Sequence, residues 1–312
     1  MKIAYLILAH HQPKQLYRLV NSLNSEHVSF FIYIDLKADI SKFDCYDYGS
    51  NVFFIKNRVF VNRFGYSQPQ AMINLIRTAE ASNEYDYFIF LSGNDYPIKD
   101  NNYIYNYLKN NYPTNFINFY PLVGSADKVN NIKQYRFVDI IKDSPKYLNI
   151  PLRFIQFMIN KLFPNRSFMK GIIPYRGSTS WCLNRQTINY IVEYLESPKS
   201  KKYVKYFKSV WGSDEIFFQT LILNSPYAKQ CRYYERDIKN STTFMINENK
   251  AFLHYIDWSR DREDPAILDM RDYELLKNSD LLFGRKFFEH KSDELLDKID
   301  KNLLNTICSP SG

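Results

Sequence analysis

The sequence predicts an α/β protein with a mostly parallel, doubly wound sheet and flanking helices. Apolar runs of strand length cover residues 1–9, 28–35 and 87–91, and stretches with apolar residues at helical spacing separate them. Continuous apolar runs suit strands that are covered on both faces. Strands that alternate with helices are typical of parallel sheets. The chain has 312 residues and 45% hydrophobic content, so it can bury a sizeable core.

The remaining elements follow from the same patterns. Further strands are expected at residues 51–55, 115–120 and 177–183. Helices are expected to start at or near Pro13, Ser67, Asp100, Ser213 and Ser292, because proline and small polar residues favour helix N-termini. The order of strands and helices therefore alternates through the first third of the chain, as a doubly wound sheet requires.

The strand at residues 87–91 stops abruptly at the turn sequence SGNDYP (residues 92–97). In open α/β sheets, ligands bind outside the carboxyl ends of parallel strands. This places Asp95 at a candidate site, although an Asx turn that ends the strand explains the same residue equally well. Ala9 ends the first strand and is followed by His10 and His11, and Asp35 ends the second strand. The same edge of the sheet therefore collects several polar side chains.

The net charge of +8 is concentrated in one segment. Residues 128–176 contain ten Lys and Arg but only two acidic residues, Asp139 and Asp143. Such a surface suits phosphorylated ligands or an anionic membrane, and no nucleic-acid motif is present; an ordinary solvated face is the alternative. Within it, residues 150–163 form a strongly apolar helix, for which packing on the sheet is preferred to a membrane interface. The four cysteines lack metal-ligand spacing.

Two stretches in the second half have chemical character. The helix after WGSDE (residues 211–215) begins with two carboxylates. Acidic residues in a first turn favour the helix dipole by roughly 0.3–1 kcal/mol, which is a purely structural explanation. A glutamate held there is also suited to accept a proton. Trp181 is either a sugar platform or a core residue, and the cations Arg285 and Lys286 lie between Phe283 and Phe287.

Together these motifs resemble the core-2/I-branching β-1,6-N-acetylglucosaminyltransferase family, which also includes peptide O-xylosyltransferases. The resemblance rests on the ordered motifs LSGNDYPI (91–98), GS (177–178) with Trp181, WGSDE (211–215), YIDW (255–258) and LFGRKF (282–287). It implies a GT-A fold, a nucleotide-sugar donor, inversion at the anomeric carbon, and neither a cofactor nor a required metal. The sequence GND (93–95) has one acid where manganese-dependent enzymes of this fold have a DxD.

The resemblance also implies roles for individual residues. Glu215 matches the general base, and Asp214 would orient or cap. Lys286 is the first choice to neutralise the diphosphate, with Arg285 beside it and Arg262 as a weaker candidate. The remaining candidates for substrate binding are Ala9, His10, His11, Asp35, Arg58 and Asp95 on the nucleotide side, and Trp181 and Trp258 at the sugar sites.

We expect one GT-A-like domain over residues 1–312, with a nucleotide-sugar half (1–125), a basic and aromatic insertion (126–176) and an acceptor and catalytic half (177–312). The expected donor is UDP-N-acetylglucosamine; UDP-xylose, or glycan binding without turnover, is the alternative. The expected acceptor is a glycan or lipid-linked glycan. Because no membrane anchor is seen, we expect a trimmed enzyme of bacterial type in the cytoplasm, with peripheral contact at the inner membrane face.

Overall fold

The computed structural model describes residues 1–122, 132–164, 166–234, 251–259, 262 and 265–304. Its centre is a six-stranded sheet with the order β3 (Val52–Phe54), β2 (Val28–Ile34), β1 (Ile3–Ala9), β4 (Tyr87–Ser92), β9 (Trp181–Asn184) and β6 (Phe116–Ile117). The first four of these strands run parallel, and β9 runs antiparallel to both of its neighbours. The predicted α/β fold with a mostly parallel sheet is confirmed, in line with the GT-A fold that the resemblance implies.

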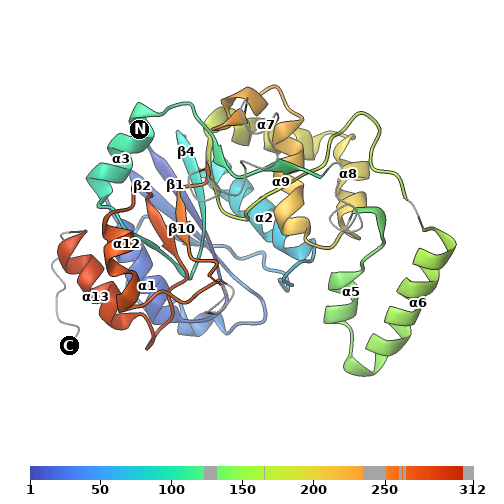
Figure 1. Ribbon diagram of the computed structural model, residues 1–312, viewed down its shortest axis with the longest axis horizontal. Coiled ribbons are helices and arrows are strands. Elements are labelled where there is room, and N and C mark those ends of the chain that lie inside the picture. The colour runs from blue at the N-terminus through green and yellow to red at the C-terminus, as the bar shows by residue number, and fades with distance from the viewer. Residues whose placement is uncertain (123–131, 165, 235–250, 260–261, 263–264, 305–312) are drawn as a thin grey trace.

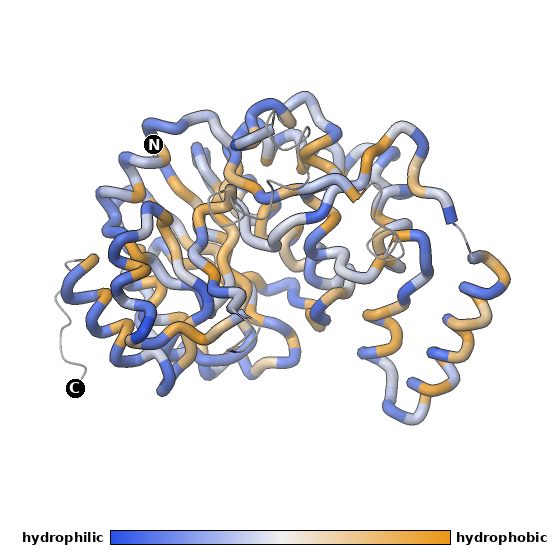
Figure 2. The backbone as a smooth tube through the Cα atoms, viewed as in Figure 1, coloured by the Kyte–Doolittle hydropathy of each residue, from blue (hydrophilic) through white to orange (hydrophobic). Residues whose placement is uncertain are grey.

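Helices cover both faces of this sheet (Figure 1). One face packs against α1 (Pro13–Leu23), α3 (Asn101–Asn110) and α13 (Asp293–Asn302), and the other against α2 (Ser67–Ser82), α7 (Arg185–Glu196) and α9 (Ser213–Leu223). Successive residues of β1 alternate between the two cores, as the pleat of a strand requires. The apolar strands accordingly run through the middle of the molecule in Figure 2.

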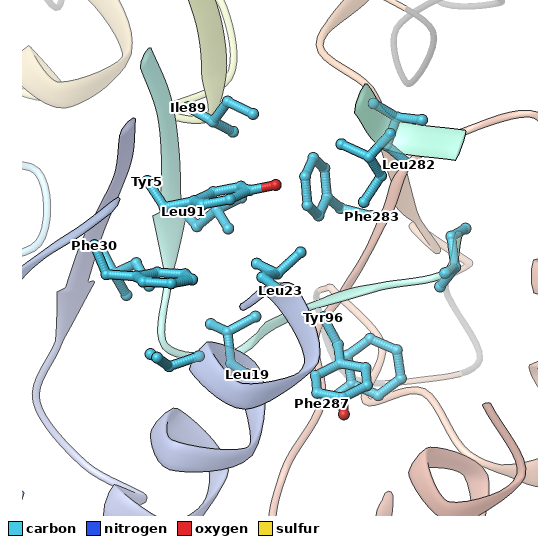
Figure 3. Close-up of a cluster of buried hydrophobic side chains, with 14 of the residues drawn as sticks. Tyr5, Leu19, Leu23, Phe30, Ile89, Leu91, Tyr96, Leu282, Phe283 and Phe287 are labelled. Carbon is cyan, nitrogen blue, oxygen red and sulfur yellow. The ribbon is translucent and has the colours of Figure 1, made fainter. Parts of the chain in front are cut away.

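A second, three-stranded sheet joins the C-terminal part of the chain to β5 (Asp95–Pro97), the strand that follows β4. In it, β10 (His254–Ile256) runs parallel to β11 (Phe283–Arg285), which runs antiparallel to β5. Figure 3 shows how Phe283 and Phe287 fill the space beside Leu19 and Leu23 of α1, so the two sheets share one apolar core. This packing positions the segment that carries Arg285 and Lys286.

The remaining elements are shorter or peripheral. They are η1 (Ile40–Lys42), β7 (Tyr120–Pro121), α5 (Val138–Asp143), η2 (Lys146–Leu148), α6 (Asn149–Leu162), β8 (Tyr175–Arg176), α8 (Ser200–Phe207), η3 (Ala228–Gln230), η5 (Met270–Asp272) and α12 (Tyr273–Lys277). Among the described helices, none has the length and apolar character that crossing a bilayer demands.

The prediction that the apolar helix at residues 150–163 packs on the sheet is wrong. The helix is present as α6, but it buries no residue and projects away from the sheet together with α5 (Figure 1). Its packing partners are α5 and η2. The apolar pattern predicts a buried face, whereas in the structure much of this apolar surface is open to solvent.

The helices begin near the predicted positions, but not all of the predicted residues cap them. Asp100 caps α3 as expected, because its carboxylate accepts the backbone N–H of Tyr103 at 2.9 Å. Ser213 is not the N-cap of α9: Gly212 takes that position with φ 74°, where glycine is favoured. The Ser213 hydroxyl instead donates to backbone carbonyls that precede it, and Ser292 likewise sits before α13 without a capping side-chain bond.

Candidate active site

A cleft of about 570 Å³ lies at the carboxyl ends of β1, β2 and β4. Ala9, Asp35 and Ser92 mark the ends of these three strands and line it. Lys286 and Glu215 also line the cleft, although they lie far from those strands in the sequence. The position agrees with the rule that α/β sheets bind ligands beyond the carboxyl ends of their strands.

Asp95 lies beneath one wall of this cleft rather than in it. Its side chain is fully buried and accepts hydrogen bonds from the Ser92 backbone N–H at 2.7 Å and from Arg285 Nη1 at 2.9 Å. His254 Nε2 lies 3.6 Å from Oδ2 of the same carboxylate. Burial alone raises the pKa of Asp95, but Arg285 and His254 outweigh burial and hold that pKa at about 2. The expectation that Asp95 contacts substrate is therefore corrected: Asp95 positions Arg285.

Arg285 and Lys286 form a cationic wall. Arg285 uses only Nη1 for its bonds to Asp95 and Ser92, so its other two guanidinium nitrogens have no bond to a described residue. The Lys286 backbone is held by Leu268, whose N–H donates to the Lys286 carbonyl at 2.9 Å. Both side chains line the cleft. Two fixed cations side by side suit a diphosphate group.

Two histidines follow β1, and only one of them reaches the cleft. His10 lines it, and burial lowers its pKa, with Lys37 and Arg285 adding to this effect and Asp35 opposing it. His11 packs its ring against His10 and Phe288 and does not line the cleft. Burial lowers the pKa of His11 to about 4. Neither imidazole therefore adds a positive charge to this region at neutral pH.

The acidic end of the cleft is built at the N-terminus of α9. Arg176 donates through both Nε, at 2.7 Å, and Nη2 to the same oxygen of Glu215, Oε2. The other oxygen, Oε1, has no hydrogen bond to any residue that the structure describes. The guanidinium also lies over the Trp211 ring, 5.6 Å from its centroid. Glu215 is thus held by one oxygen and presents the second.

The backbone around Glu215 is fixed by glycine. The Gly177 N–H donates to the Glu215 carbonyl at 2.9 Å, which joins the segment between β8 and β9 to α9. A Cβ at Gly177 would lie 1.8 Å from the Asn118 carbonyl oxygen, so a larger residue cannot occupy this position without displacing backbone. The glycine in the motif before Trp181 is therefore required for the acidic end to form.

Asp214 is buried beside Glu215. Its side chain is 5% exposed, and its Oδ1 atom has no hydrogen-bond partner among the residues that the structure describes. Burial, and after it the neighbouring charge of Glu215, raises the pKa of Asp214 to about 7. Asp214 therefore changes its protonation near neutral pH, while its neighbour is paired with an arginine.

Eight of the residues that the sequence singled out line the cleft. These are Ala9, His10, Asp35, Asp214, Glu215, Trp258, Arg285 and Lys286. Asp35 is 6% exposed, and its carboxylate accepts the backbone N–H groups of Lys37 and Val61 at 3.0 and 3.1 Å. Trp258 is 52% exposed, which suits a residue at the rim.

Besides Asp95 and His11, three other candidates do not line the cleft. Trp181 is 1% exposed and stacks on Phe90 with centroids 5.5 Å apart, so it is a core residue and not a sugar platform. Arg58 bonds the Ala38 carbonyl at 3.4 Å. Arg262 is ion-paired with Asp257 and Asp272, at 3.1 and 2.8 Å, which accounts for its charge. A sequence motif does not distinguish a tryptophan on the buried face of a strand from one at a rim.

Arg176 is the main cleft residue that the sequence reasoning missed. The sequence shows it only as the last cation of the basic segment, because no acidic residue lies near it in the sequence. Its position directly before the Gly177-Ser178 motif was the available signal. Arg63, Asn94 and Ser178 also line the cleft. In the part of the chain that the structure describes, there is no cluster of three or more His, Cys, Asp or Glu side chains that could hold a metal ion.

The burial of Asp214 predicts a pH-dependent effect of Asp214→Asn. Its folded-state pKa of about 7 exceeds the ordinary 3.8, so this group's contribution to stability is complete below about pH 4 and is lost as pH rises through 7. Asparagine stays neutral. The stability advantage of Asp214→Asn, measured by urea unfolding, should therefore grow by about 2–3 kcal/mol between about pH 5 and about pH 8.

The control is Asp44→Asn, at an exposed aspartate. Its stability difference from the wild type should stay the same at both pH values. An Asp214→Asn difference that is equally independent of pH contradicts the assignment of a raised pKa.

Comparison with known proteins identifies the family to which this chain belongs. A sequence model described as Branch: Core-2/I-Branching enzyme matches residues 3–279. The chain is 22% identical to Xylosyltransferase 2 of Rattus norvegicus, over 97% of this chain and 34% of that protein. It is 25% identical to a human beta-1,3-galactosyl-O-glycosyl-glycoprotein beta-1,6-N-acetylglucosaminyltransferase, over 70% of this chain and 48% of that protein.

A beta-glucuronosyltransferase of Arabidopsis thaliana is 24% identical over 72% of this chain and 50% of that protein. The chain thus spans about a third to a half of the length of these curated relatives. Among solved structures, glucosyl-3-phosphoglycerate synthase from Mycobacterium tuberculosis aligns with a TM-score of 0.30 at 10% identity, over 61% of this chain and 58% of that one, which is too low to bear on function. The family model, in contrast, covers most of the chain, and this protein belongs to the Core-2/I-Branching enzyme family.

Proposed function

We propose that this protein is an inverting glycosyltransferase that moves a sugar from a nucleotide-diphosphate donor to a hydroxyl of a glycan acceptor without a metal ion. The observation that carries the proposal is that one cleft is lined both by the cationic pair Arg285 and Lys286 and by Glu215, whose Oε1 atom bonds no described residue. Membership of the family supports the class of reaction.

Glu215 is the general base in this proposal. The acceptor hydroxyl gives its proton to Oε1 of Glu215 as its oxygen forms a bond to C1 of the sugar. The attack comes from the face opposite the diphosphate, so the configuration at C1 inverts. The C1–O bond to the diphosphate breaks, and the leaving group takes the electron pair. Arg176 holds the carboxylate through Oε2 during this step, which keeps Oε1 directed to the acceptor.

Arg285 and Lys286 stabilise the charge that develops on the departing diphosphate. Fixed cations that are in place before the reaction need no reorganisation in the transition state. Asp95 supports this role indirectly, because its buried carboxylate fixes Arg285 by one nitrogen and leaves two others for phosphate oxygens. The metal-independence of the reaction is a proposal that rests on these two cations.

The donor sugar is proposed as N-acetylglucosamine, carried by UDP, with xylose as the second candidate. The relatives bear names for xylosyl, N-acetylglucosaminyl and glucuronosyl transfer, so they support the class of donor more firmly than the particular sugar. A glycan-binding protein without turnover is the competing function. An unpaired carboxylate oxygen in the same cleft as a diphosphate-sized cationic pair favours the enzyme, because binding alone needs neither arrangement.

Replacing Glu215 by glutamine should abolish transfer and leave nucleotide binding nearly unchanged. The amide keeps the size of the side chain but cannot accept the proton, so kcat should fall by about 100-fold or more. UDP affinity, measured by calorimetry, should stay within about two-fold of the wild type, because Glu215 lies at the acceptor side in the proposal. The control is Glu193→Gln on the exposed side of α7, which should retain full activity.

A parallel loss of UDP binding and activity in Glu215→Gln would instead assign Glu215 a structural role. Unchanged activity in this variant would rule it out as the base and direct attention to Asp214.

Replacing Lys286 by alanine should weaken UDP binding by about 10- to 100-fold in the presence of EDTA. This range corresponds to the loss of one charge-assisted hydrogen bond to phosphate. Lys286 is a cleaner test than Arg285, because Arg285 also compensates the buried charge of Asp95. The matched control is Lys291→Ala, at an exposed lysine of the same segment. Equal affinity of wild type and Lys286→Ala for UDP would contradict the diphosphate site.

A further inference from the structure

We propose that α5 and α6, with the turn between them, form a hairpin that docks on an anionic lipid surface. This docking hairpin comprises residues 138–163 and stands apart from the sheet and its covering helices (Figure 1). It lies outside the cleft, since no hairpin residue lines it. The proposal therefore does not depend on the proposed transfer reaction.

The outer helix of the hairpin, α6, is amphipathic, but its polar face points to the protein and its apolar face points to solvent. Its amides face the protein: Gln156 accepts the Phe137 N–H at 2.8 Å, and Asn160 bonds both the N–H and the carbonyl of Tyr135. Its large apolar side chains face solvent. The exposed apolar residues of the hairpin are Ile140, Tyr147, Leu148, Ile150, Phe154, Ile155, Phe157, Leu162 and Phe163, several of them more than 60% exposed.

Such a face is unusual for a soluble surface. Monomeric proteins seldom expose large contiguous apolar areas, and those that do use them for binding. Figure 2 shows the apolar stretches of α6 at the edge of the molecule that is farthest from the sheet. The 14 residues of α6 give a length of about 21 Å, which suits a helix lying in the plane of a bilayer interface.

The charges of the hairpin identify the partner as anionic. Its two acidic residues bond the body of the protein: Asp139 accepts from Asn62 and Ser67, and Asp143 from Asn62. Between residues 144 and 192 the sequence contains no Asp or Glu. The exposed basic side chains Lys146, Arg153 and Lys161 are therefore not balanced by acidic residues on this surface.

Apolar side chains interleaved with cations match an anionic membrane better than a second copy of the chain. A two-fold contact between two hairpins would bring cations of the same kind together, and like charges across an interface oppose association. An anionic lipid surface accepts both features at once: the aromatic rings enter the acyl boundary, and the lysine and arginine side chains reach the phosphates.

The test is flotation of the full chain with vesicles of phosphatidylcholine, with or without phosphatidylglycerol. The wild type should float with the anionic vesicles and not with the neutral ones. Neutralising Lys146, Arg153 and Lys161 to glutamine should weaken binding on the order of 100-fold, because each surface cation contributes separately. The double substitution Phe154→Ser and Phe157→Ser should abolish flotation without changing the unfolding temperature, since both rings are exposed.

The matched control neutralises three exposed lysines outside the hairpin, Lys56, Lys109 and Lys301, and should bind vesicles like the wild type. If this control loses as much vesicle binding as the hairpin variant, then the overall charge of the protein explains the effect, and the proposal is overturned. Failure of the wild type to float with anionic vesicles would also overturn it. A dimer in solution that the phenylalanine substitutions dissociate, without vesicle binding, would assign the face to a second copy instead.

Discussion

The buried ion pair between Asp95 and Arg285 is the interaction on which the arrangement of the site depends. It joins β5, directly after the central strand β4, to β11 near the end of the chain, where the two residues lie opposite each other in the sheet register. The Phe287 N–H donates to the Asn94 carbonyl at 2.9 Å on the same side, so the segment is fixed on both sides of Lys286. A carboxylate that stays ionised without exposure to solvent is stabilised by a cation beside it, and here that cation, Arg285, also lines the cleft.

At the acidic end of the cleft an ion pair also fixes a side chain that lines the cleft, but here that side chain is a carboxylate, Glu215. Arg176 compensates Glu215 through one oxygen, while no cation in the described part of the chain bonds Asp214. The pKa of Asp214 rises to about 7 through burial first and Glu215 second. Two adjacent carboxyl groups thus have different surroundings: Arg176 pairs with Glu215, whereas burial is the main cause of the raised pKa of Asp214. The cleft is lined by two cations, Arg285 and Lys286, and by the carboxyl groups of Asp214 and Glu215, and the proposed transfer assigns a separate task to each pair.

The sequence predicted the central sheet well, because strands buried on both faces appear as uninterrupted apolar runs. It also predicted Glu215, Arg285 and Lys286 as candidates, because they lie in the motifs WGSDE and LFGRKF, which can be identified from the sequence. All three line one cleft. It could not tell Trp181 from Trp258, because exposure is decided by the tertiary contacts of each side chain. The partners of Asp95 and Glu215 lie about 190 and 39 positions away, so no local pattern reveals them. Apolar periodicity likewise failed for α6, because it identifies an apolar face without stating what covers it.

The most direct test of the account is transfer from UDP-N-acetylglucosamine or UDP-xylose to a glycan acceptor in EDTA, with the anomeric configuration of the product read by NMR. An α-linked donor should give a β-linked product, and the rate should not depend on added manganese, because Arg285 and Lys286 supply the positive charge. Loss of activity in EDTA that manganese restores, or a product with retained configuration, would contradict the central claim.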